Sequence, residues 1–244
     1  MIETFTALLF AHALADFMFQ TDWINRNKTR VTVLLLHGAI VLVLSLMAVG
    51  HLAAPAVLGL AAVHIAIDAV KTFGGFRNFT AFVIDQALHV VTIIIVAFFV
   101  SDLWQSGYWA TQHTQIATLA LPVMALAAGL ILTLSAGQYA IGIMMQSHTV
   151  RLRGRGLRNG GRQIGLLERG LIFFFVLSSQ PLAVGFLIAA KSILRFGTAS
   201  QDQRTAEYVI IGTLASFGWA FVAATATVWW LGQLPPLEIF APRP

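Results

Sequence analysis

Seven long apolar runs, separated by short polar segments, dominate the 244-residue chain. A hydrocarbon core about 30 Å thick needs about 20 apolar residues per helix, and it offers no water to unpaired backbone groups, so such runs fold as helices. Only 10% of the residues are charged, against about a quarter in soluble domains. The sequence therefore predicts an all-α, polytopic transmembrane helical bundle. Its runs are Phe5–Phe19, Val31–Val49, Leu52–Val70, Thr80–Val100, Gln115–Met145, Ile164–Leu194 and Ala206–Leu231.

The sixth run, Ile164–Leu194, contains a helix breaker. Pro181 lacks the backbone N–H and its ring clashes with the preceding turn of a helix. Because basic residues collect in cytoplasmic loops, we prefer a helical hairpin around Gln180–Pro181, which returns Lys191 and Arg195 to the cytoplasmic side. One long, tilted or kinked helix is the alternative. The hairpin gives a bundle of about seven or eight helices.

Basic residues also predict the orientation of the chain. They fall in alternate loops, which places the N-terminus outside. The first run has no basic segment before it and no small-residue cleavage site after it, so it reads as a retained span. The basic loops are Asp22–Arg30, Lys71–Asn78 and Ser147–Gln163, whereas Gly50–His51 and Ser101–Thr114 contain no Lys or Arg.

The runs and loops divide the chain into five segments. Its net charge of +5 suits membrane orientation and anionic lipid headgroups, so membrane lipids are the expected partners and nucleic acid is not. We expect a four-helix half with the candidate site at 1–100, an external loop and fifth span at 101–146, a basic cytoplasmic linker at 147–163, a C-terminal helical half at 164–234 and a Pro-rich tail at 235–244.

Histidine and aspartate recur inside the first four runs, where lipid disfavours them. Three His/Asp pairs lie four residues apart, a spacing that puts both side chains on one face of a helix. With the predicted orientation, all of these residues lie at one depth, about one to three turns from the cytoplasmic helix ends. The set comprises His12, Asp16, His37, His64, Asp68, Asp85 and His89.

This set predicts a divalent metal site. An ionised carboxylate in a membrane is costly, and the runs that hold these residues contain no Lys or Arg before Lys71, so we expect a cation to balance the carboxylates. The chain has no cysteine, and nitrogen and oxygen donors suit zinc, manganese or iron, with four histidines favouring zinc. Seven donors allow one or two ions. The alternative is that these residues only link helices by hydrogen bonds.

The expected reaction is hydrolysis of a lipid or of a lipid-linked phosphate or ester. A zinc-type ion lowers the pKa of a bound water from roughly 15.7 to about 7 and so supplies hydroxide. A carboxylate left unligated would act as general base, and the candidates are Asp16, Asp85 and Glu168. Charged and amide side chains near the same face would hold the substrate's anionic group; these are Gln20, Gln86, Arg162, Arg169, Lys191 and Arg195.

Other functions use the same residues. A transporter would bind a metal ion or relay protons, and it would need access from both sides and often an inverted repeat, whereas the His/Asp pattern occupies only the first half. A structural metal would staple four helices in a closed site. A diiron oxidoreductase is a third alternative, although the Glu-x-x-His spacing usual in such bundles is absent.

Several short motifs recur in order in a known family. "HALADFMFQTDWINRNK", "LLLHGAI", "HIAIDAVK" and "DQALH", over roughly residues 5–95, resemble the DUF3307 family of uncharacterised bacterial inner-membrane proteins. "GRQIGLLERGLIF", "AAKSILRF" and "AEYVIIGTL" look like the C-terminal half of its longer members. The resemblance implies a multi-pass protein of the bacterial inner membrane and no particular activity. A more distant likeness is to YdjM-like membrane-bound, metal-dependent hydrolases, and no residue roles are transferred from it.

Overall fold

The computed structural model describes residues 1–112, 115–147, 159–199 and 203–235, and within these ranges the chain forms helices and no strand. Six of the described helices are long and apolar enough to cross a membrane, which confirms the predicted all-α bundle of membrane helices. The chain forms two compact units, Met1–Ile131 with the segment from Trp229, and Leu132–Val228. The candidate spans are Ile2–Phe19, Val31–Val49, Pro55–Phe73, Phe79–Phe99, Thr118–Gln146 and Gln203–Leu231.

Helix α1 (Ile2–Leu14) is the central helix of the first unit. It contacts α3, α5 and α7, and it buries small residues, including Ala7 and Ala11 one turn apart, so neighbouring backbones approach closely. A π-helical turn, η1 (Ala15–Phe19), follows it directly. The other helices of this unit are α2 (Asp22–Asn27), α3 (Val31–Val49), α4 (Pro55–Phe73), α5 (Phe79–Phe99), α6 (Tyr108–Thr111) and α7 (Gln115–Ile131).

The end of the last long helix also packs on α1. Trp230 donates an indole hydrogen bond to the hydroxyl of Thr6 over 2.9 Å. Its ring lies 5.7 Å from that of Phe5, centroid to centroid. Trp230 and Thr6 are both buried, so this bond replaces the water that neither group can reach. Residues 224 positions apart are thereby joined in one unit.

Short capped connections fix the loop ends of α2 and α5. The Thr21 hydroxyl accepts a hydrogen bond from the Ile24 amide (3.3 Å) at the start of α2. The Asn78 side chain accepts one from the Ala81 amide (2.8 Å) at the start of α5. Such caps satisfy amides that the first turn of a helix leaves unpaired. Both caps lie in connections between helices that carry the polar cluster described below.

The second unit contains the predicted helix break. Three residues separate helix α9 (Gly160–Leu177) from α10 (Pro181–Ala199). The two helices lie antiparallel and pack together. Ser179 in the turn has a φ of 58°. The run at 164–194 is therefore a helical hairpin and not one long helix. A core of Ile172, Val184, Phe217 and Ala220 joins it to α11 (Gln203–Leu231), and η2 (Leu132–Ala136) and α8 (Gly137–Gln146) complete the unit.

Candidate metal centre

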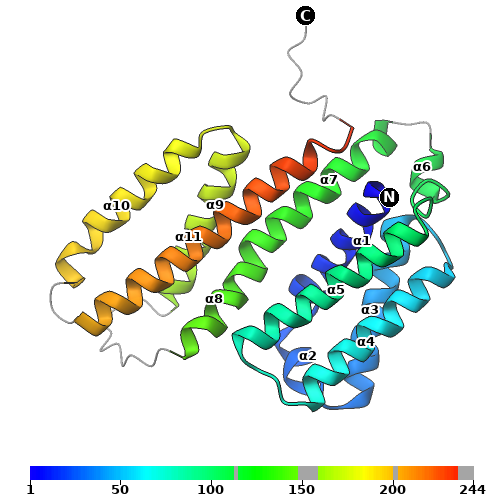
Figure 1. Cartoon of the computed structure of the whole chain (residues 1–244), viewed down its shortest axis with the longest axis horizontal. Coiled ribbons are helices and arrows are strands. Elements are labelled where there is room, and N and C mark those ends of the chain that lie inside the picture. The colour runs from blue at the N-terminus through cyan, green and yellow to red at the C-terminus, as the bar shows by residue number, and fades with distance from the viewer. Residues whose placement is uncertain (113–114, 148–158, 200–202, 236–244) are drawn as a thin grey trace, which may run out of the picture. The chain divides into compact units, whose positions relative to one another are not determined.

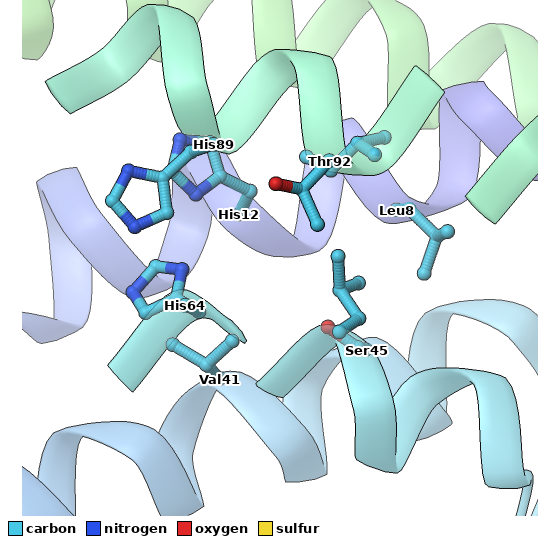
Figure 2. A pocket seen from close by; sticks show the side chains of 9 residues that line it. Leu8, His12, Val41, Ser45, His64, His89 and Thr92 are labelled. Atoms are coloured by element: carbon cyan, nitrogen blue, oxygen red, sulfur yellow. The ribbon is translucent and has the colours of Figure 1, made fainter. Parts of the chain in front are cut away.

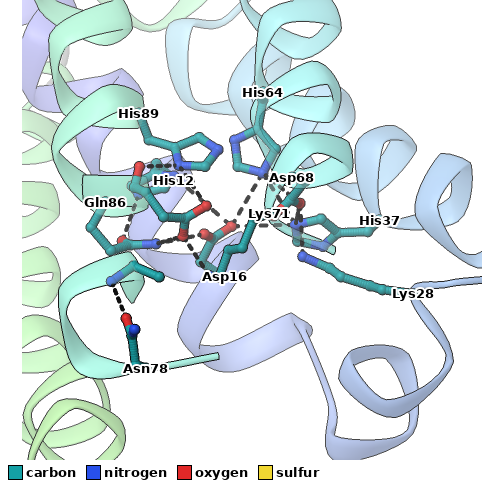
Figure 3. Close-up of polar contacts among 12 residues, drawn as sticks. His12, Asp16, Lys28, His37, His64, Asp68, Lys71, Asn78, Gln86 and His89 are labelled. Atoms are coloured by element: carbon teal, nitrogen blue, oxygen red, sulfur yellow. Dashed lines mark hydrogen bonds and ion pairs between the residues drawn. The ribbon is translucent and has the colours of Figure 1, made fainter. Parts of the chain in front are cut away.

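The seven predicted His and Asp side chains come together inside the first unit (Figure 3). They project from five elements: α1, η1, α3, α4 and α5. Four of them lie three to six residues from the nearest helix end, which is about 5–9 Å along the helix axis; these are Asp16, His37, Asp68 and Asp85. The four histidines, Asp68 and Asp85 are at most 4% exposed. The side chain of Asp16 is 6% exposed and lies in the π-helical turn, a feature common at functional sites.

Four of these side chains each place one nitrogen or oxygen atom in a compact group. Nε2 of His37 and Nε2 of His64 are 3.2 Å apart. Oδ1 of Asp16 lies 3.3 Å from the first nitrogen and 3.4 Å from the second. Oδ2 of Asp68 lies 3.3 Å from the first and 3.6 Å from the second. These five distances define a compact group of four donor atoms, which we call the four-atom set.

The hydrogen bonds of Gln86 fix the proton on His12. The Gln86 amide nitrogen donates to Asp16 Oδ2 (3.3 Å) and to Asp85 Oδ2 (3.2 Å), so its carbonyl oxygen faces His12 Nε2 at 3.2 Å. That nitrogen must donate, which leaves Nδ1 of neutral His12 with a bare lone pair. Nδ1 lies 3.9 Å from Asp16 Oδ1, and neither atom has a hydrogen-bond partner among the described residues. Two bare acceptors facing each other favour a cation between them.

His89 shows the same arrangement. Its Nδ1 donates to the backbone carbonyl of Asp85 over 2.8 Å, which leaves Nε2 unprotonated, buried and without a partner in the described part of the chain. Metal-binding histidines almost always donate their second ring N–H to a carbonyl or carboxylate in this way. Gln86 and the Asp85 carbonyl therefore orient His12 and His89 as ligands are oriented.

Two lysines contact the carboxylates, and this corrects the sequence analysis. Nζ of Lys28 lies 2.7 Å from Asp68 Oδ2, and Nζ of Lys71 lies 2.6 Å from Asp85 Oδ2. The expectation that only a bound cation balances the carboxylates is therefore wrong for Asp68 and Asp85. The sequence pattern does not place Lys28 at the cluster, because this residue follows α2 in a polar loop and only its long aliphatic stem reaches back to Asp68.

The lysines change the charge of the cluster. Three carboxylates and two ammonium groups leave one net negative charge when all four imidazoles are neutral. One divalent ion would change the net charge of the cluster to one positive charge, whereas two divalent ions would change it to three positive charges. Like charges repel strongly in a medium of low dielectric constant, so this arrangement favours one ion over two.

A small cavity adjoins three of the histidines (Figure 2). His12, His64 and His89 line it together with the hydroxyl-bearing residues Ser45 and Thr92, and apolar side chains complete the wall. It has room for about one water molecule. The cluster is thus layered, with lysines and carboxylates at the loop end, imidazoles in the middle and this cavity beyond them.

The remaining predicted site residues lie in several places. Gln20 follows η1, and its buried Oε1 has no hydrogen-bond partner among the described residues. Glu168, Arg169 and Lys191 belong to the second unit, as does the exposed Arg162. Arg195 lies in α10, and its side chain is outside the described residues. The catalytic and substrate-binding roles of this whole group stay predictions.

The charges of the second unit have protein partners. Lys191 donates to Glu168 over 2.6 Å and lies 5.0 Å from the centroid of the Phe217 ring. Arg169 donates to the Ser216 hydroxyl and to the Leu134 carbonyl, each over 3.1 Å. The second of these bonds satisfies a backbone oxygen of the π-helical turn η2, a structural use of the guanidinium.

Replacing Lys191 by methionine should destabilise the protein by about 3 kcal/mol, because it leaves the Glu168 carboxylate buried without its partner. The two side chains are 15% and 10% exposed, so water screens the loss little. Thermal unfolding in detergent measures the effect. The double variant Glu168→Gln/Lys191→Met removes both charges and should recover most of the stability. Equal melting temperatures for the single and double variants would contradict this account.

Comparison with known proteins identifies a family for residues 4–118, and this family has no assigned activity. Residues 4–118 match the model of a family described as a protein of unknown function. No curated protein and no solved structure matches the chain. The distant likeness to YdjM-like hydrolases therefore stays a prediction, and the chemistry must be argued from the cluster itself.

Proposed function

Over residues 4–118 the chain belongs to that family, DUF3307, and we propose that it is a membrane metalloprotein whose His/Asp cluster binds one zinc ion. The observation that carries the proposal is the four-atom set, in which two imidazole nitrogens lie 3.2 Å apart and each of two carboxylate oxygens lies 3.3–3.6 Å from both of them. Hydrogen bonding alone leaves Oδ1 of Asp16 without a partner among the described residues. A cation at the centre of the set satisfies it.

The size of the four-atom set favours zinc. Zinc–ligand bonds of 2.0–2.2 Å place the corners of a tetrahedron about 3.3–3.6 Å apart. Six ligands around magnesium, at 2.0–2.1 Å, would place neighbouring donors only about 2.8–3.0 Å apart. Imidazole nitrogen is also a poor donor for magnesium or calcium and a good one for zinc, iron or manganese. Zinc fits both the spacing and the donor types, and the charge of the cluster favours a single ion.

The reaction that we propose is hydrolysis of a lipid or of a lipid-linked phosphate or ester. A zinc ion supplies hydroxide near neutral pH because it lowers the pKa of a water bound to it. The carboxylate of Asp85 is the candidate for proton transfer. Its Oδ1 is buried without a hydrogen-bond partner in the described residues, and one of its two oxygens lies within 4.8 Å of an oxygen of Asp68. The short distance from the cluster to the helix ends suits a substrate whose reactive group lies near the headgroups. A place in the bacterial inner membrane accords with this substrate and is part of the proposal.

A structural zinc site is the second candidate function. Four protein donors complete a tetrahedron, and a closed set of this kind is typical of zinc ions that staple a fold. Catalytic sites instead use three protein ligands and keep one position for water. The two functions therefore differ in whether Asp68 ligates the ion, and this can be measured.

Metal content tests the proposal directly. The full-length protein, purified in detergent after growth with zinc, should contain about one zinc ion per chain by elemental analysis. Asp16→Ala/Asp68→Ala should contain none above background, and Asp16→Asn, which keeps the side-chain shape and leaves the Lys28 ion pair intact, should lose most of it. Asp102→Ala, in the loop after α5, is the matched control and should keep its zinc. A wild type with no more metal than the double variant would refute the proposal.

A further inference from the structure

The oxygen of Asp68 in the four-atom set is also the oxygen that Lys28 contacts. Nζ of Lys28 lies 2.7 Å from Oδ2, and the same Oδ2 lies 3.3 Å from His37 Nε2 and 3.6 Å from His64 Nε2. Full ligation of an ion by this oxygen would bring two positive charges to one atom. The repulsion between them would be screened little, because both side chains are buried.

The two carboxylates of the set are therefore not equivalent. Oδ1 of Asp16 has no hydrogen-bond partner among the described residues, so its negative charge is available to an ion. Oδ2 of Asp68 is already neutralised by an ammonium group. Within the four-atom set, His37, His64 and Asp16 are the three donors that an incoming ion can use without displacing the Lys28 ammonium.

Resting on the proposed metal site, we propose that Lys28 is a positioning residue that holds Asp68 away from the ion. The ion then takes three protein ligands, and its fourth position stays open to water or to a small anion. This is the arrangement of a catalytic zinc site, whereas the full four-atom set would make a structural one. Lys28 thus decides between the two functions.

The setting of Lys28 suits this role. It is 6% exposed and directly follows α2, a short helix that is capped by Thr21 and packs against α3. A buried lysine is strongly tied to its carboxylate, because losing the partner leaves an uncompensated charge. Lys71 differs, since its side chain is 27% exposed and its partner Asp85 lies outside the four-atom set. It provides a matched control.

Removal of the Lys28 ammonium should raise the affinity of the site for a divalent ion and close the coordination position that is open to water. In K28M the side chain keeps most of its volume, and Asp68 can complete the set around the ion. The affinity for a divalent ion should rise at least tenfold, since a competing cation is gone and a fourth ligand is gained. At the same time the open position should disappear. A residue that only stabilises the fold would lower the affinity when replaced.

Cobalt(II) substitution makes the open position visible. Cobalt(II) replaces zinc in such sites, and its visible absorption bands change when a small anion enters the coordination shell. The full-length protein, loaded with cobalt in detergent, is titrated with azide. The wild type and K71M should show a saturable change in the bands, whereas K28M should show a tetrahedral spectrum that azide leaves unchanged. Competition with a chromophoric chelator gives the affinities.

The outcomes separate this inference from the proposed function. A wild type that binds neither cobalt nor zinc refutes the metal site itself. A wild type that binds cobalt but does not respond to azide has a closed site, and then the metalloprotein stands while the role of Lys28 fails. A K28M variant that keeps the azide response and the wild-type affinity overturns the inference as well. A wild type that does not respond to azide overturns the inference even where K28M does not fold.

Discussion

Replacing His64 by glutamine should lower the zinc affinity by more than about 100-fold, a larger loss than removal of a supporting residue around the ligands causes. Nε2 of His64 lies 3.2–3.6 Å from each of the other three atoms of the four-atom set, so its loss removes a donor that neighbours all of them. Glutamine keeps a polar group of moderate length but cannot place a nitrogen lone pair there. Competition with a chromophoric chelator, on detergent-purified protein, measures the loss.

His51 provides the matched control for this variant. Its Nε2 contacts the Leu103 carbonyl at 2.8 Å, in a loop that carries none of the cluster. His51→Gln should bind zinc as the wild type does. An equal loss in both variants would mean that the effect comes from the fold, and an unchanged His64→Gln would remove His64 from the ligands.

Chelation of the metal should lower the melting temperature of the wild type by about 10 °C. The donors of the four-atom set come from η1, α3 and α4, so one ion ties three segments of the first unit together. A ligand present at 1,000 times its dissociation constant stabilises the state that binds it by about 4 kcal/mol. For a chain of this size each kcal/mol corresponds to roughly 2–4 °C. Thermal unfolding in detergent, with and without a chelator, measures the shift.

Asp16→Asn tells whether this stabilisation passes through the cluster. The variant keeps the shape of the side chain but loses the charge that the ion needs, so the chelator should leave its melting temperature unchanged. An equal fall in both proteins would show that the chelator acts elsewhere. The ion pairs of Lys28 and Lys71 explain why the metal-free protein should still fold.

The helices and the composition of the cluster were predictable because both depend on simple periodicities. Lipid requires long apolar helices, and the predicted run Val31–Val49 coincides with α3. Pro181 cannot continue a helix from the preceding turn, and the hairpin turns there. Each His of the three pairs lies four residues from its Asp, and this spacing places both side chains on the same face of a helix. Basic loops placed the pairs at one depth, and the structure brings the pairs and His37 together.

The ion pairs and the π-helical turn could not be predicted from the same signals. Lys28 lies outside every apolar run, and only the path of the chain through α2 returns it to the cluster. The π-helical turn at Asp16 depends on a shift of backbone hydrogen bonds, which no residue type marks. The partner of Arg169, a carbonyl of η2, depends on the same kind of shift. The sequence pattern indicates which groups gather but not how their charges balance.

The bond between Trp230 and Thr6 bears on how the protein is made. A ribosome produces roughly 5–20 residues per second, so the first helix enters the bilayer many seconds before its indole partner exists. During that interval the Thr6 hydroxyl can bond only to its own helix, where it reaches the Ile2 carbonyl over 2.7 Å. The packing of α1 is thus completed only after the last long helix has been made.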